Sequence, residues 1–86
     1  MKVIFDEKAL DDYINWQNED RKTLKRINNL IKDIQRSSFT GIGKPEPLIG
    51  ENGKWSRRID DSNRLVYQIV NENVEILQCR NHYKDK

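Results

Sequence analysis

The 86-residue sequence contains little cysteine, histidine or proline, and each shortage excludes a class of protein. The only cysteine is Cys79, so an internal disulfide is impossible and nothing requires an oxidising compartment. One cysteine and one histidine, His82, are too few for a four-ligand zinc site, and no metal or cofactor is expected. No apolar run is long enough for a signal peptide or a membrane span, so we expect a soluble cytoplasmic protein.

Charged residues are abundant, but neither sign dominates. They make up 35% of the chain, against about a quarter in typical proteins, so most of the surface must be ionic. The formal net charge is only +2, yet the acidic residues crowd 6–20 while most arginines and lysines follow them. Such a basic concentration suits a phosphate backbone, although the basic side chains of 22–36 could equally form an ordinary solvated face.

The chain is long enough for one small hydrophobic core, and residues 1–86 are expected to form a single domain. Residues 2–5 predict a short strand, and Asp6 is a plausible N-cap for the helix after it. Apolar residues at three- and four-residue steps predict that helix and a second one. The two apolar stripes cover 9–16 and 24–34, and the polar sequence "QNED" breaks the pattern between them.

The apolar period changes to two after the loop "RSSFTGIGKPEP". Three strands joined by short hairpin turns are predicted there, over 54–59, 64–70 and 74–80. In the middle strand Leu65 and the alternate residues after it are expected to face the core. Arg64, Val66 and Gln68 should then face water or a ligand. The predicted fold class is α+β, with an N-terminal strand and two helices packed on one face of an antiparallel sheet of about four strands.

A few side chains outside the apolar pattern could carry acid–base chemistry on RNA. Glu46 stands between two prolines in "KPEP", which restrict the backbone around its carboxylate. Arg58 and Arg64 flank a single turn and must lie close together. If His82 joins them, Glu46 could take the proton of a ribose 2′-OH and His82 could protonate the departing 5′-oxygen. The arginines would stabilise charge on the phosphoryl oxygens, and DNA, which has no 2′-OH, would not react.

Each of these residues also has an ordinary interpretation. Glu46 could be a solvated loop carboxylate and His82 a surface residue near the terminus. Arg57 and Arg58 could simply discourage aggregation at a sheet edge. Tyr83 could be a base-stacking platform or a packing residue, and spacing alone does not say whether Glu46 and His82 converge. Core positions are expected for Trp16, Trp55 and Cys79.

Several motifs, in order along the chain, resemble one family of bacterial toxins. They are "DDY" with Trp16 in the first helix, "KRINNLIKDIQR" in the second, "GKPEPL", "WSRRI", "NRLVY" and the closing "HY". Together they look like the YoeB branch of the RelE-type toxins, the ribonuclease components of type II toxin–antitoxin modules. The resemblance covers nearly the whole chain. It implies a microbial-ribonuclease-like (RelE-like) fold and cleavage of messenger RNA in the A site of the 70S ribosome.

The resemblance also implies partners and residue roles. A cognate YefM-like antitoxin would wrap the toxin, the toxin would form homodimers, and their complex would bind operator DNA and repress the operon. By motif, Glu46 is the general base, His82 the general acid and Arg64 the group that binds the scissile phosphate. Arg58 supports that charge, and Tyr83 shapes the end of the site. Further substrate contacts are expected from Lys44, Lys54, Arg57 and Arg80.

Two departures from the family pattern leave alternatives open. Many relatives carry a lysine directly after "PEPL", where this chain has Ile49, and Lys44 or Lys54 could replace that contact. Relatives commonly stop at the tyrosine, whereas residues 84–86 follow it here. The chain could therefore be a catalytically weak toxin that acts as an antitoxin-bound co-repressor. A gyrase-binding ParE-like toxin is the other alternative, although that branch usually lacks the glutamate and terminal histidine found here.

Overall fold

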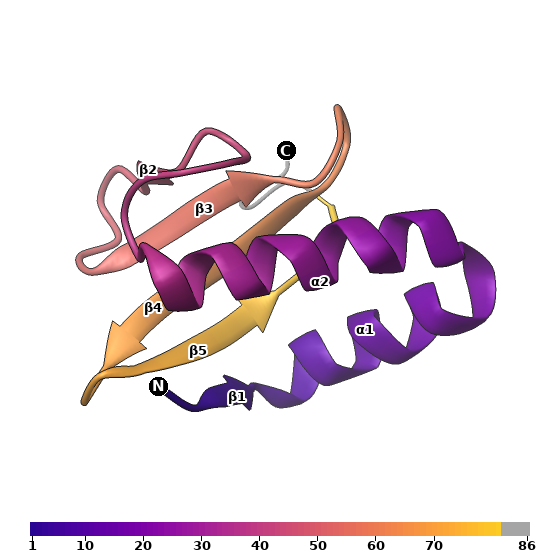
Figure 1. The fold of residues 1–86 in the computed structure, drawn as a ribbon, viewed down its shortest axis with the longest axis horizontal. Helices are drawn as coiled ribbons and strands as arrows, with labels where there is room; N and C mark the ends of the chain where they lie inside the picture. Colours follow the sequence, from indigo (N-terminus) through magenta and orange to yellow (C-terminus); the bar gives the residue numbers. More distant parts are fainter. Residues whose placement is uncertain (82–86) are drawn as a thin grey trace.

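The computed structural model describes residues 1–81, and in that part of the chain two helices cover one face of a five-stranded sheet (Figure 1). The elements follow in the order β1 (Val3–Phe5), α1 (Glu7–Glu19), α2 (Arg21–Arg36), β2 (Glu46–Pro47), β3 (Lys54–Arg58), β4 (Arg64–Val70) and β5 (Asn73–Gln78). The predicted α+β class is confirmed. The sheet has one strand more than expected because Glu46–Pro47 pairs with β3 as an edge strand.

The sheet is mixed rather than wholly antiparallel. Its strand order is β1-β5-β4-β3-β2, and β1 lies parallel to β5, with Val3 opposite Val74 in register. The strands β3, β4 and β5 form the predicted antiparallel meander. The helices and the loop after them carry the chain across the sheet, so the last strand of the meander can run beside β1 in the same direction (Figure 1).

The predicted break between the helices is only one residue long. The helix α1 continues through the polar "QNE" to Glu19, so Asp20 alone separates it from α2. Asp6 occupies the N-cap position of α1, as predicted, but its side chain forms no capping hydrogen bond. The Asp20 carboxylate does cap α2, accepting from the backbone N–H groups of Lys22 (3.1 Å) and Thr23 (3.4 Å). Asp20 therefore ends one helix and begins the next.

The core lies between the helices and the sheet. Trp16 is only 6% exposed and donates its indole N–H to the carbonyl of Cys79 at 2.8 Å, so the predicted core placement of both residues is confirmed. Trp55 and Ile69 are partly buried and pack against this core. Neither helix of the described chain has the length and apolar character needed to cross a membrane. The fully buried apolar residues are Ala9, Ile27, Leu30, Ile34, Leu65, Val66, Tyr67, Val74, Ile76 and Cys79.

A bulge in β5 changes which of its residues face the core. Tyr67 lies opposite Ile76, whereas the adjacent Val66 lies opposite Gln78, so β5 has one extra residue at this point. The bulge moves the inward-facing positions from the even-numbered Ile76 to the odd-numbered Cys79, and both are fully buried. Burial raises the pKa of the Cys79 thiol to about 12, which keeps the thiol in its unreactive protonated form.

Candidate active site

The loop that carries the proline-flanked acid packs tightly against α2 and β3. Gly41 has a φ of +120°, and a Cβ there would lie 2.0 Å from a carboxylate oxygen of Asp33. Gly43 has a φ of +81°, and its carbonyl accepts the backbone N–H of Arg58 at 2.6 Å. The backbone angles and the close approach both favour glycine at these positions. The glycines thus let the chain pass closely over the helix before it delivers Glu46 to the sheet edge.

Glu46 lies on the edge strand β2 and faces away from the helices. In register it stands opposite Ser56 of β3, which in turn stands opposite Val66 of β4. Leu65, the neighbour of Val66, belongs to the core under the helices. Adjacent residues of a strand point to opposite faces, and directly opposed residues point to the same face. The exposed Glu46 therefore lies on the helix-free face of the sheet.

The middle of this helix-free face is closed rather than open to water. Val66 points to this side as predicted, but it is fully buried. It lies on the central strand, where a short side chain has the longer Arg64 and Gln68 as neighbours on the same face. Ser56, opposite Val66, is only 4% exposed. Val66 and Ser56 thus form a buried, uncharged surface between Glu46 and the two arginines, Arg58 and Arg64.

Arg58 and Arg64 stand directly opposite each other on the helix-free face, which confirms their predicted proximity. Among residues 1–81 neither arginine forms an ion pair. The Nε of Arg58 is shielded from solvent and has no hydrogen-bond partner in the described chain. A buried donor without a partner costs free energy until a ligand supplies an acceptor. Two opposed guanidiniums are suited to an anion with several oxygens, such as a phosphate.

The acid and the arginines are close enough to act on one nucleotide. Glu46 and Arg64 are two strands and two residues apart on the same face. With strands ~4.8 Å apart and a rise of ~3.3 Å per residue, their Cα atoms lie about 12 Å from each other. Both side chains are long, so their charged ends can approach a common ligand from opposite sides.

His82 and Tyr83, the expected general acid and its neighbour, lie outside the described residues, as do residues 84–86. The last described residue, Asn81, is held beside Arg64 by hydrogen bonds of its backbone. The Asn81 carbonyl accepts the backbone N–H of Arg64 at 3.0 Å, and its own N–H donates to the side-chain oxygen of Asn63 at 2.6 Å. The described chain therefore ends next to one of the two paired arginines.

Arg57, expected to bind substrate, is instead fully buried on the helix side of β3. Its Nη1 donates to Asp33 at 2.6 Å and its Nε donates to the Tyr67 hydroxyl at 3.3 Å. Strand alternation explains the difference, because the adjacent Arg57 and Arg58 must point to opposite faces. Arg57 is therefore not available to a ligand on the helix-free face.

Arg80 was also expected to bind substrate, but its side chain binds residues of α1. Its guanidinium donates to both carboxylate oxygens of Glu19, at 2.8 and 3.2 Å, and lies 4.4 Å from the ring centroid of Trp16. The hydrogen bond from Arg80 lowers the pKa of the Glu19 carboxyl. Lys54, another expected substrate contact, forms an ion pair with Glu51 at 3.2 Å. Both basic residues thus have acidic partners within the fold.

Lys44 and Ile49 flank Glu46 in the loops on either side of β2. Lys44 is exposed and has a φ of +51°, which is unusual for a residue with a side chain. Ile49 stands where many relatives have lysine, and it is 97% exposed. No packing in the described chain requires an isoleucine at that position. Of the expected additional contacts, Lys44 lies nearest in sequence to the acid.

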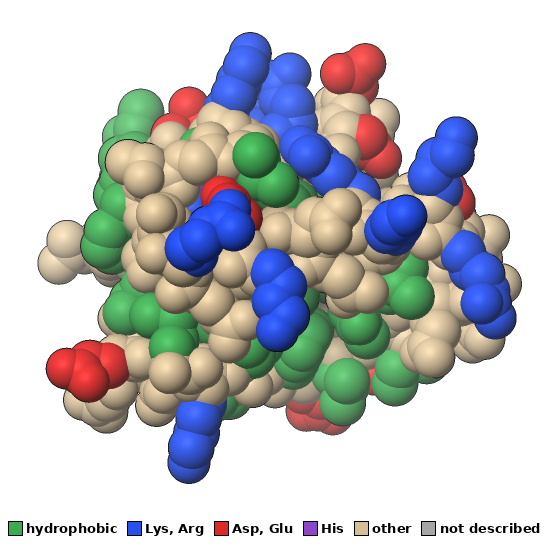
Figure 2. Space-filling model, viewed as in Figure 1, with side chains coloured by type: hydrophobic (Ala, Val, Ile, Leu, Met, Phe, Trp, Pro, Cys, Tyr) green, Lys and Arg blue, Asp and Glu red, His purple; other side chains and the backbone are tan. Residues whose placement is uncertain are grey.

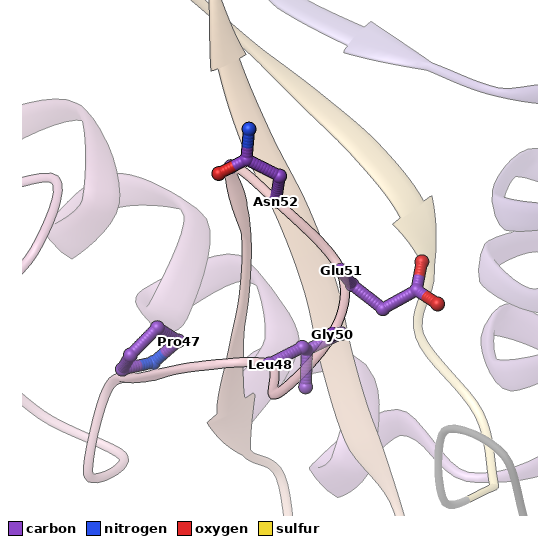
Figure 3. A pocket seen from close by; sticks show the side chains of 6 residues that line it. Pro47, Leu48, Gly50, Glu51 and Asn52 are labelled. Atoms are coloured by element: carbon purple, nitrogen blue, oxygen red, sulfur yellow. The ribbon is translucent and has the colours of Figure 1, made fainter.

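A pocket of about 360 Å³ lies in the hairpin between β2 and β3 (Figure 3). Pro47 and Leu48 line it where the chain enters the turn, and the Glu51 side chain points away from Pro47. No arginine lines this pocket, so it lies beside the Glu46–Arg64 region rather than within it. The complete lining is Pro47, Leu48, Gly50, Glu51, Asn52 and Gly53.

A second basic surface lies on the opposite face of the molecule. Figure 2 shows the molecule from the helix side, with Lys and Arg side chains spread along the region of α2. This stripe is separate from the face that carries Glu46. The exposed basic residues of α2 are Arg21, Lys22, Lys25, Lys32 and Arg36.

Asp33 was not among the expected site residues, yet it organises the loop that leads to Glu46. Its carboxylate accepts from the guanidinium of Arg57, from the guanidinium of Arg36 and from the backbone N–H of Ile42, the last at 3.0 Å. The hydrogen bond from Arg57, followed by that from Ile42, holds the pKa of Asp33 below its usual range. A signal was present, because a carboxylate within the apolar stripe of a helix needs a buried partner.

Known proteins are similar to this chain in both sequence and fold. The model of the YoeB-like toxin family of bacterial type II toxin–antitoxin systems matches residues 5–83. Toxin YoeB of Streptomyces coelicolor is 51% identical over 84 residues, which cover 96% of this chain and 100% of that protein. The YoeB/ParE toxin from Agrobacterium tumefaciens has a TM-score of 0.93 at 43% identity, covering 96% of this chain and 100% of that one.

YoeB from Staphylococcus aureus has been solved in two assemblies. The dimer matches with a TM-score of 0.91 at 40% identity, and the heterotetrameric complex with YefM matches with 0.86 at 41% identity. Both matches cover 96% of this chain and 98% of the solved one. Helices on one face of a mixed sheet, with these neighbours, define the class of RelE-like toxins. The chain belongs to the YoeB-like toxin family of bacterial type II toxin–antitoxin systems.

Proposed function

We propose that this chain is an endoribonuclease that cleaves messenger RNA in the ribosomal A site and so stops translation in the cytoplasm. The observation that supports this most directly is the shared helix-free face of Glu46, Arg58 and Arg64. Neither arginine has an ion-pair partner among residues 1–81, and the exposed acid lies within reach of the same ligand. Membership of the YoeB-like toxin family supports the same reaction.

The proposed reaction is attack by a ribose oxygen on its own phosphodiester. Glu46 removes the proton from the 2′-OH, and the 2′-oxygen forms a bond to the adjacent phosphorus. The bond from phosphorus to the 5′-oxygen breaks, and His82 donates a proton to that oxygen. The products are a 2′,3′-cyclic phosphate and a 5′-hydroxyl, with Tyr83 bounding the end of the site. Each proton transfer is expected to contribute about 10²–10⁴-fold in rate.

The arginines stabilise the charge that grows on the phosphoryl oxygens during this attack. Arg64 contacts the scissile phosphate and Arg58 supports it; one donor is the Arg58 Nε, which has no hydrogen-bond partner among the described residues. Losing one such donor from a water-excluded site typically costs about 10²–10³-fold. We expect Lys44, which is exposed and two residues before Glu46, to contact the RNA backbone.

The same charged face offers a means of inhibition by an antitoxin. The YoeB of S. aureus has been solved as a dimer and in a heterotetramer with YefM. By analogy we propose a homodimer, a YefM-like antitoxin and a complex that binds operator DNA. An acidic antitoxin segment that folds on contact would place a carboxylate between Arg58 and Arg64 and exclude RNA.

The test is cleavage of a defined message on translating ribosomes, with the RNA ends mapped. Glu46→Gln and His82→Gln should each lower the cleavage rate by about 10²–10⁴-fold, because each removes one proton-transfer group. The matched control is Glu72→Gln, at the exposed turn between β4 and β5, which should cleave like the unaltered protein.

Other results would identify one of the alternatives. Undiminished cleavage by both variants would disprove the acid–base assignment. Intact RNA together with inhibited DNA supercoiling would favour a gyrase toxin. If induced expression leaves growth unaffected, a co-repressor without catalysis becomes the better explanation.

A further inference from the structure

Arg57 is a buried cation whose hydrogen bonds are directed mainly at one loop. Among residues 1–81 it has five hydrogen-bond contacts, which equals the number of N–H groups of a guanidinium. One is to Asp33 and one to the hydroxyl of Tyr67. The other three go to backbone carbonyls of the loop, those of Ser37 (2.6 Å), Thr40 (2.8 Å) and Ile42 (3.1 Å).

Asp33 and Tyr67 hold the same loop from either side of the guanidinium. The Asp33 carboxylate accepts the backbone N–H of Ile42 at 3.0 Å, and the Tyr67 hydroxyl donates to the carbonyl of Ser38 at 2.7 Å. We call Asp33, Arg57 and Tyr67 the loop latch. Loop residues 37–45 form no strand pairing of their own. Besides the latch, they are attached by the bond from Arg58 N–H to Gly43, by the Ser38 hydroxyl, which donates to the Ile34 carbonyl, and by the ring contact of Phe39 with Trp55.

Filling space in the core does not explain this arrangement. An apolar pair of similar volume commonly stabilises a core as well as a buried ion pair does. An apolar side chain, however, cannot bind three carbonyls that point at one spot. The planar fork of arginine can, and lysine cannot reproduce its geometry. What the latch adds is therefore a defined path for the loop.

That path ends at the proposed general base. Glu46 follows Ile42 by four residues and enters the sheet opposite Ser56. We infer that Arg57 and Asp33 are positioning residues, which act through the loop to hold Glu46 at the reacting 2′-OH. The inference rests on the proposed ribonuclease function. A displacement of about 1 Å in a catalytic group can lower a rate by about 10²-fold.

The decisive variant removes the latch without leaving a buried charge. Arg57→Met combined with Asp33→Leu replaces both partners by apolar side chains, which preserves stability better than either change alone. The loop carbonyls then lose their donors. We expect this double variant to unfold cooperatively and to lose about 10²-fold in kcat. Its KM for the message should rise much less, because Arg58 and Arg64 are untouched and only Lys44 moves with the loop.

A second measurement does not depend on catalysis. The backbone N–H of Leu48 donates to the carbonyl of Lys54 at 2.9 Å, so its hydrogen exchange reports whether β2 is docked on β3. In the double variant exchange at Leu48 should accelerate at least tenfold, while amides of β4 keep their protection. Ala9→Gly, a core change in α1, an element that contributes no residue to the latch, is the control for a general loss of stability. It should change neither the relative protection of Leu48 nor kcat.

The outcomes separate the inference from the function on which it rests. A double variant with normal kcat and a protected Leu48 amide would overturn the inference. If the unaltered protein itself leaves RNA intact, the proposed function fails, and a deprotected Leu48 still shows that the latch docks the loop. Should the double variant not fold, Asp33→Asn is measured in the same way. It keeps the shape of Asp33 and should show a smaller loss of kcat with faster exchange at Leu48.

Discussion

At the scale of single residues, the stability of the fold does not explain why arginine occupies positions 58 and 64. They face each other across β3 and β4 and have no acidic partner among residues 1–81. Like charges in directly opposed positions destabilise a strand pair, and cross-strand pair terms are of order 0.2–1 kcal/mol. A bound phosphate would reverse the sign of that contribution.

Arg64→Gln should therefore stabilise the free protein while impairing its activity. Removing one charge relieves the repulsion, so we expect the free energy of unfolding to rise by up to about 1 kcal/mol. RNA cleavage should fall by about 10²–10³-fold. Urea unfolding and cleavage assays at low ionic strength measure both effects, and the stability gain should shrink in ~1 M salt because salt screens the repulsion. A variant that is less stable yet still cleaves would contradict this account.

Sequence reasoning could bring Arg58 and Arg64 together because one short turn joins their strands. It could place Glu46 only in the loop, because β2 is two residues long and has no periodicity to detect. It wrongly expected Arg57 at the substrate because it treated Arg57 and Arg58 alike, although their side chains point to opposite faces of the sheet. Asp33 was overlooked because a buried ion pair joins positions far apart in the sequence.

At the scale of elements, the meander and the two helices follow from apolar periodicity, and strand β4 has the predicted bounds. The end of α1 differs because "QNE" continues the helix after the apolar stripe stops, since its outer face can be polar throughout. The parallel pairing of β1 could not be predicted, because no short turn connects it to its neighbour.

Gly41 allows a test of how tightly loop residues 37–45 pack against α2. Gly41→Ala and Gly50→Ala both place a Cβ on a backbone with positive φ, of +120° and +79°. Only Gly41 also has a steric conflict, because its Cβ would lie 2.0 Å from Asp33 while nothing lies within 4 Å of Gly50. We expect Gly41→Ala to lower the free energy of unfolding by about 2 kcal/mol or more, and Gly50→Ala by about 1 kcal/mol. Equal losses in chemical denaturation would indicate that the loop can move away from Asp33.

At the scale of the whole molecule, stability should decline in acid. Asp33 accepts a hydrogen bond from Arg57, Glu19 from Arg80 and Asp20 from Thr23, and each of these carboxyls has a lowered pKa. A carboxyl whose pKa is lower in the folded state stabilises the fold fully above its unfolded pKa of about 4. That contribution disappears as the pH falls through the lower folded-state pKa. The fold thus depends on carboxylates at both ends of α2 and at the end of α1.

Asp33→Asn should make this dependence visible. We expect the variant to be less stable than the unaltered protein at pH 7, and to lose less stability when the pH is lowered from about 5 to 2. Ile34→Val is the matched control, because it weakens the same helix without removing a titrating group. It should keep the acid-dependent slope of the unaltered protein in urea unfolding. An unchanged slope in Asp33→Asn would show that this carboxyl does not contribute to acid sensitivity.

The parallel pairing of β1 with β5 has a consequence for a nascent chain. Residues 3–5 are synthesised well before residues 74–76, with which they pair, and the Trp16 side chain of α1 is hydrogen-bonded to Cys79. Pairings between such distant segments form late, because the ends of a long loop must meet first. The sheet therefore stays incomplete until residues 74–76 have been synthesised. Under the proposed function, this topology delays cleavage on the ribosome that makes the chain and gives an antitoxin time to bind.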